Sequence, residues 1–120
     1  MSYELYMGQD DILRLVYTGP IEEGELDVFV AEYEVFLGER TAESPLLMLS
    51  EATRAGKLSP EARKVFADLG QDPRLAKNAI VGVGRYARVI AGFINKAAGR
   101  DNIRFFETEE EALAWLLDCR

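Results

Sequence analysis

The sequence contains no histidine and a single cysteine, and these absences exclude several common kinds of protein chemistry. Zinc sites built from histidine and cysteine clusters, and nucleophiles activated by a histidine, require residues that the chain does not have. An internal disulfide requires two cysteines, whereas Cys119 has no second cysteine to pair with. We therefore expect no metal site, no cofactor and no enzymatic activity.

Long apolar runs and a basic amino terminus are also missing. No unbroken apolar run approaches the roughly 18 residues that a membrane-spanning helix requires. The first residues, MSYELYMGQDD, carry acids where a signal peptide would carry bases. A chain of 120 residues has a common size for one folded domain. We expect a single domain over residues 1–120, without a transmembrane segment and with a cytoplasmic location.

The net charge of −7 argues against nucleic-acid binding, because contacts to phosphates need a basic surface. The charge is unevenly distributed along the chain. Residues 1–51 hold 12 acids and 2 bases, residues 52–106 hold 4 acids and 11 bases, and residues 107–120 hold 5 acids and 1 base. The basic middle is a candidate anion site or partner surface; alternatively, folding interleaves the segments into a mixed surface.

Apolar residues alternate or recur with helical spacing along most of the chain. Leu26 to Leu37 contain one continuous apolar stripe of a helix, and Leu46 to Leu49 are typical of a strand buried on both faces. Thr108 and Glu111 have the spacing of a capping box at a helix start, and Gly38 stands where a left-handed helix end is expected. The predicted order is strands over residues 3–7 and 12–18, a helix over 22–37, a strand over 46–49, a helix over 59–70, a strand over 79–83, a helix from 86, a strand over 103–106 and a helix from 108.

This order of elements predicts an α/β fold. Because most of the strands are separated by helices, most neighbouring strands should be parallel, with one antiparallel hairpin at the start. We expect a mixed, mostly parallel sheet of about five strands, flanked by four helices.

Two polar stretches that follow apolar strands supply candidate binding residues. The first follows the strand over 46–49, at the edge where open α/β sheets usually bind ligands. The second follows the strand over 79–83, and we expect it to face the first. Ordinary loop formation and solvation of the arginines are the alternative interpretations. The candidate ligand- or partner-binding residues are Ser50, Glu51, Thr53, Arg85, Tyr86 and Arg88.

The glycines in the stretch from Lys77 to Gly99 resemble a phosphate-binding loop only superficially. Gly82 and Gly84, followed by Ala87, partly match a dinucleotide fingerprint. Arg104, rather than an acid, stands 20 residues past Gly84, and too little chain remains for the second half of a dinucleotide-binding domain. We instead expect these glycines to allow a sharp exit from the strand or a close approach of another backbone.

Three segments carry a resemblance to a known family. The run LLMLSEATRAG, the strand NAIVGVGRYARV and the ending IRFFETEEEALAWL, together with the order of elements, look like the SpoIIAA-like family, a STAS-type group of small bacterial domains. The resemblance covers nearly the whole chain. It implies a STAS-like α/β sandwich, with an architecture similar to that of lipid-binding domains of the CRAL-TRIO type.

The resemblance also bears on phosphorylation. Anti-sigma antagonists of the STAS class carry an Asp-x-Ser motif whose serine is phosphorylated by a partner kinase. In this chain Ser50 stands near that place, but Met48 replaces the aspartate. This difference argues against a phosphorylation switch at Ser50.

Two hypotheses for function follow. The first is a non-enzymatic regulatory or protein-interaction module, which docks its helical face or sheet edge to a protein partner or, as a homodimer, to a second copy. The second is a domain that binds a small apolar or anionic molecule or a lipid, in an apolar pocket between the first long helix and the helix from Tyr86.

Overall fold

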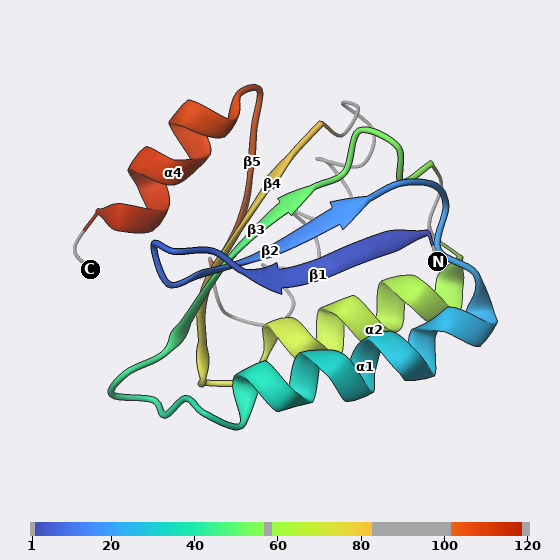
Figure 1. Cartoon of the computed structure of the whole chain (residues 1–120), viewed down its shortest axis with the longest axis horizontal. Helices are drawn as coiled ribbons and strands as arrows, with labels where there is room; N and C mark the ends of the chain where they lie inside the picture. Colours follow the sequence, from blue (N-terminus) through green and yellow to red (C-terminus); the bar gives the residue numbers. More distant parts are fainter. Residues whose placement is uncertain (1, 57–58, 83–101, 119–120) are drawn as a thin grey trace.

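Five strands and three helices make up the described part of the chain (Figure 1). The computed structural model describes residues 2–56, 59–82 and 102–118. The elements are β1 (Tyr3–Met7), β2 (Ile12–Tyr17), α1 (Glu23–Leu37), β3 (Leu46–Glu51), α2 (Pro60–Gly70), β4 (Leu75–Val81), β5 (Ile103–Phe106) and α4 (Glu109–Leu117).

The strands form one sheet in the order β1-β2-β3-β4-β5. β1 and β2 are an antiparallel hairpin, and the β2–β3, β3–β4 and β4–β5 pairs are parallel. The hairpin turn is closed by the Gly8 amide, which donates to the Ile12 carbonyl at 2.9 Å. The expected mixed, mostly parallel five-stranded sheet is therefore confirmed.

The helices lie on both faces of the sheet (Figure 1). α1 and α2 cover one face and α4 covers the other. Alternate residues of the buried strands point to opposite sides, so each face of the sheet has its own core. Phe29 of α1 is central to the larger core, with its ring centroid 5.4 Å from that of Tyr3 and 5.2 Å from that of Phe66. The smaller core under α4 consists of Ile12, Leu47, Leu49, Ala79, Val81, Ala112 and Leu116.

The helix count differs from the expectation. The described residues contain three helices rather than four, and the helix expected from Tyr86 falls in residues 83–101, outside the described part of the chain. None of the three described helices is long and apolar enough to cross a membrane.

The sequence signals at helix ends were mostly correct. The Ala62 amide donates to the Ser59 hydroxyl at 3.1 Å, and the Glu111 amide donates to the Thr108 hydroxyl at 3.2 Å. The prediction for Gly38 was wrong, because its φ of −62° is right-handed. The chain leaves α1 through a further right-handed turn, in which the Arg40 amide donates to the Leu37 carbonyl at 2.9 Å.

β4 begins four residues earlier than expected, at Leu75 rather than Ala79. The polar residues at the start of this strand do not give an apolar strand pattern. Lys77 nevertheless pairs with Leu47, and Asn78 pairs with Met48 of β3. The Lys77 ammonium lies 5.0 Å from the centroid of the Trp115 ring and donates to the Trp115 carbonyl at 2.8 Å. Contacts with neighbouring elements therefore determine where this strand begins.

Gly82 directly follows β4, and its backbone lies close to the chain that follows β3. Its φ is +84°, a left-handed conformation that side chains disfavour. A Cβ atom at this position would lie 2.7 Å from the Thr53 amide nitrogen. The close approach expected from the sequence is confirmed at this glycine.

Replacing Gly82 by alanine should lower the free energy of unfolding by about 1–3 kcal/mol, because it adds both backbone strain and a steric clash. The matched control is Gly24→Ala in α1, where a Cβ meets no atom within 4 Å. The control should raise stability by up to about 1 kcal/mol. Urea unfolding followed by circular dichroism measures both, and equal effects of the two changes would contradict the prediction.

Candidate functional site

The carboxyl ends of β3 and β4 carry two of the predicted site residues. β3 extends to Glu51 rather than ending at Leu49 as expected, so Glu51 is the last residue of the strand and Thr53 lies in the loop that follows it. The Glu51 carboxylate accepts hydrogen bonds from the Thr53 amide, at 3.1 Å, and from the Thr53 hydroxyl. The Ala52 amide donates to the Val81 carbonyl at 2.8 Å, which joins the loop to the end of β4. Thr53 is exposed and Glu51 is half-buried. The loop is therefore a fixed polar surface at this edge of the sheet.

Ser50 lies on the opposite side of the strand from Glu51. Its side chain is only 3% exposed and points into the core under α1 and α2, where its hydroxyl donates to the Asn78 side-chain oxygen at 2.9 Å. Because successive strand residues face opposite sides, Ser50 cannot join Glu51 and Thr53 in one exposed site. A kinase would have to open the core to reach this hydroxyl.

The other three predicted site residues are Arg85, Tyr86 and Arg88. They lie in residues 83–101, outside the described part of the chain. Their approach to the loop after β3 stays a prediction. Among the described residues, no group of three or more acids or cysteines is gathered as a metal site would require.

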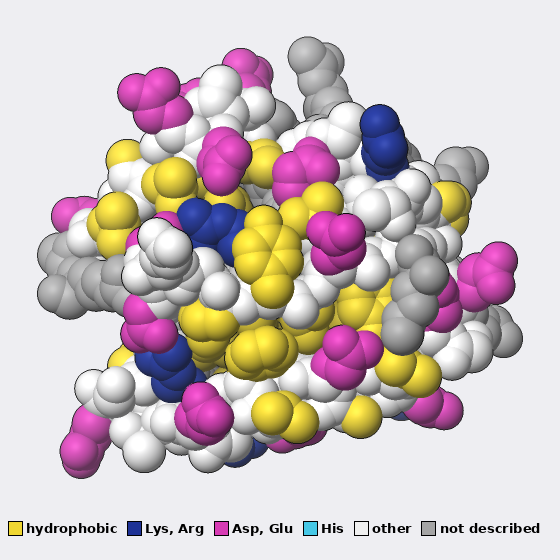
Figure 2. Space-filling model, viewed as in Figure 1, with side chains coloured by type: hydrophobic (Ala, Val, Ile, Leu, Met, Phe, Trp, Pro, Cys, Tyr) yellow, Lys and Arg dark blue, Asp and Glu magenta, His cyan; other side chains and the backbone are white. Residues whose placement is uncertain are grey.

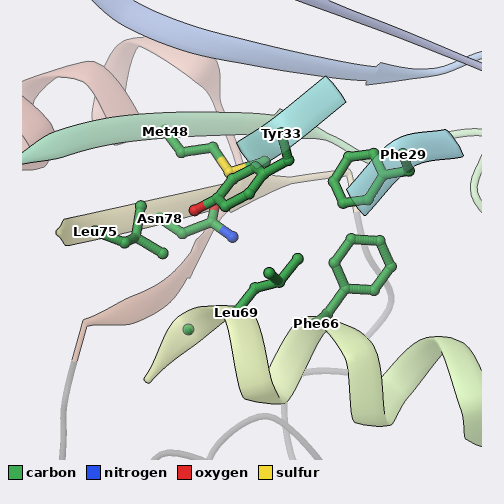
Figure 3. Close-up of a pocket in the computed structure, with 8 residues that line it drawn as sticks. Phe29, Tyr33, Met48, Phe66, Leu69, Leu75 and Asn78 are labelled. Atoms are coloured by element: carbon green, nitrogen blue, oxygen red, sulfur yellow. The ribbon is translucent and has the colours of Figure 1, made fainter. Parts of the chain in front are cut away.

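A hollow lies under α1 and α2, against β3 and β4 (Figure 3). It measures about 240 Å³ including the part open to solvent, and its enclosed part has room for roughly one water molecule. Figure 3 shows the Tyr33 hydroxyl pointing toward Asn78, with Leu69 and Phe66 of α2 across the hollow. The remaining lining residues are Phe29, Met48, Gly70 and Leu75.

Tyr33 carries a polar group with no partner in this apolar setting. Its side chain is 1% exposed, and its hydroxyl has no hydrogen-bond partner among the described residues. Burial raises the pKa of this hydroxyl well above its usual range, so it stays protonated and neutral. The sequence indicated only that Tyr33 belongs to the apolar stripe of its helix. Nothing in the local pattern revealed that Asn78 and Ser50 lie on the same side of the sheet.

Replacing Tyr33 by phenylalanine should raise the free energy of unfolding by up to about 1 kcal/mol, because it removes a buried donor without a partner. Tyr3→Phe is the matched control, since the Tyr3 hydroxyl donates to the Glu32 carboxylate at 2.8 Å. The control should cost about 1 kcal/mol. Thermal and urea unfolding measure both variants, and a loss of stability in Tyr33→Phe would contradict the prediction.

One of two similar solved structures has the same fold. A crystal structure of an uncharacterized protein with a SpoIIAA-like fold from Shewanella loihica PV-4 is 23% identical, with a TM-score of 0.72, and the match covers 95% of this chain and 91% of that one. A protein of unknown function from Arthrobacter sp. FB24 is 24% identical over 94% of this chain and 97% of that one, but with a TM-score of 0.32. No curated protein matches the chain significantly.

The model of one protein family matches most of the sequence. It is described as SpoIIAA-like and covers residues 12–117, from the second strand of the hairpin to the end of the last helix. The resemblance seen in the sequence is therefore confirmed, and the chain belongs to the SpoIIAA-like family.

Proposed function

We propose that the domain is a non-enzymatic regulatory or protein-interaction module that docks a protein partner at the carboxyl ends of β3 and β4. The observation that carries this proposal is the fixed, exposed loop in which the Glu51 carboxylate holds the Thr53 amide and hydroxyl. A polar surface that is already ordered loses little conformational entropy when a partner binds. Such a surface suits a macromolecular partner better than a small molecule, which needs a concave pocket.

The proposed surface extends beyond Glu51 and Thr53. Arg54 follows Thr53 and is exposed, so the surface carries both signs of charge. We include Arg85, Tyr86 and Arg88 on sequence grounds alone, because they follow β4 closely in the chain. Charges of both signs favour a partner with a complementary pattern rather than a uniformly charged polymer.

A pull-down with immobilised protein, from a native lysate of the source cells, tests this surface. The wild-type protein should recover a partner, and Glu51→Lys should lose it, because the change reverses a charge and breaks the hydrogen bonds to Thr53. Glu43→Lys is the control, since Glu43 makes the same charge change in the exposed loop at the amino end of β3. Recovery of no partner, or equal recovery by Glu51→Lys, would exclude docking at this loop.

A second candidate function is the binding of a small apolar molecule with one polar group. The orphaned Tyr33 hydroxyl supports it, because ligand pockets combine apolar walls with a few polar groups that fix orientation. The hollow lies between α1, α2 and the sheet, whereas the sequence suggested a pocket between the first long helix and the helix from Tyr86. A ligand larger than about one water molecule would need α1 and α2 to move apart.

Native mass spectrometry of freshly purified protein separates the two candidates. Ligand binding in the hollow predicts a co-purified mass that is lost in Leu69→Phe, which fills the space opposite Tyr33. Glu43→Lys should keep that mass. Ligand binding in the hollow would be contradicted if the wild-type protein shows only its own mass and if Leu69→Phe is as stable as the wild type.

A further inference from the structure

The outer edge of β1 is free of strand partners in the described part of the chain. β1 ends the sheet and pairs only with β2 among the described strands. The hairpin bonds from Gly8 to Ile12 and from Thr18 to Ser2 show that the even-numbered residues of this strand face β2. In an antiparallel pair the alternate residues direct their amides and carbonyls outward. Tyr3, Leu5 and Met7 therefore present backbone groups at the edge that pair with no other described strand.

The sequence of β1 contains no proline, no lysine and no bulge, three features that commonly prevent strand addition. Natural edge strands are often interrupted by proline, lysine or a bulge. β1 reads Tyr-Glu-Leu-Tyr-Met, and its register with β2 runs from Tyr3 to Met7 without a shift. A strand of this length can accept a further strand along its whole edge.

Exposed apolar side chains flank this edge on both faces of the sheet. Tyr6 is 47% exposed on the face away from α1. On the other face, Glu32 of α1 accepts a hydrogen bond from Tyr3, which places that side of the helix next to the edge. Val28 and Val35, which are 41% and 67% exposed, lie four residues before and three residues after Glu32 on the helix. Figure 2 shows apolar side chains between α1 and β1, with acidic groups around them and basic side chains beside them at the left of the view.

The charge around the edge is negative. α1 contains five acids and no base, and Glu4 of β1 is exposed. Hydrogen bonds from Ser2 lower the pKa of Glu25, which keeps this carboxyl ionised. The two bases among residues 1–51 are both engaged in the hairpin turn, where Arg14 pairs with Asp10 at 2.8 Å and Arg40 donates to Asp11 at 2.9 Å. A second copy of the chain would bring two acidic helices together, so the charge favours a basic occupant.

We propose that the outer edge of β1 binds an extended basic segment of a partner protein as an added strand. The backbone of the segment pairs with Tyr3, Leu5 and Met7, and its alternate side chains point to opposite faces. Lysine or arginine side chains meet Glu4 and Tyr6 on the face away from α1, while apolar side chains contact Val28 and Val35 on the other face. This surface shares no residue with the loop after β3, so the inference stands apart from the function proposed above.

A fluorescein-labelled peptide of alternating lysine and valine, about nine residues long, tests the proposal by fluorescence anisotropy in low salt. The wild-type protein should bind it, and Glu4→Lys should weaken binding by about tenfold or more, because it reverses the charge at the edge. Glu110→Lys on α4 is the control, since it makes the same charge change at an exposed site on a helix that covers the other end of the sheet. It should bind within about twofold of the wild type, as should Glu51→Lys.

Leu5→Pro separates strand addition from simple charge attraction. Proline removes an outward amide and is tolerated at strand edges, so this variant should fold but lose the peptide. Circular dichroism and the thermal midpoint report on folding, and Glu4→Lys keeps the test decisive if Leu5→Pro does not fold. The proposal is overturned if the peptide does not bind, if Leu5→Pro binds as the wild type does, or if the edge instead forms a homodimer in the absence of peptide.

Discussion

The pairing of β3 with β2 on one side and with β4 on the other holds the described structure together. Because both neighbours are parallel to β3 and both of its faces are covered, each of its side chains has a fixed direction. This sends Ser50 into the core beneath α1 and α2, and leaves Glu51 at the polar edge. A strand slipped by one residue would exchange these environments and bury an unpaired carboxylate. The same constraint therefore fixes both the core and the candidate docking loop.

The sequence was sufficient for those features that depend on local pattern. The apolar run of β3, the helical stripe of α1 and the cap at Ser59 each report a local preference that the tertiary structure does not oppose. Lys77 and Asn78 were missed as strand residues, because their partners come from α4 and β3 and leave no trace in nearby residues. Gly38 was misjudged because the turn that follows α1 continues right-handed into Arg40.

The candidate site could be only partly predicted, for the same reason. The apolar run indicated that the chain becomes polar at the carboxyl end of β3, where Glu51 ends the strand and accepts a hydrogen bond from the Thr53 amide. The sequence could not reveal that Tyr33 lies over Asn78, because that contact joins a helix to a strand far along the chain. The uneven charge along the sequence is partly interleaved in three dimensions, since Arg74 of the basic middle pairs with Glu34 of α1 at 3.7 Å, while α1 itself contains no base.

The contact between Lys77 and α4 stabilises the C-terminal end of the last helix. α4 has three acids in its first turn but no base in its last turn to balance the negative end of the helix dipole. Lys77 supplies that positive charge from the sheet by donating to the carbonyls of Trp115 and Asp118, at 2.8 and 3.0 Å. The C-terminal end of this nine-residue helix is thus capped by tertiary structure. An isolated peptide of residues 109–117 would lack the positive charge of Lys77. It would therefore be largely unfolded in water.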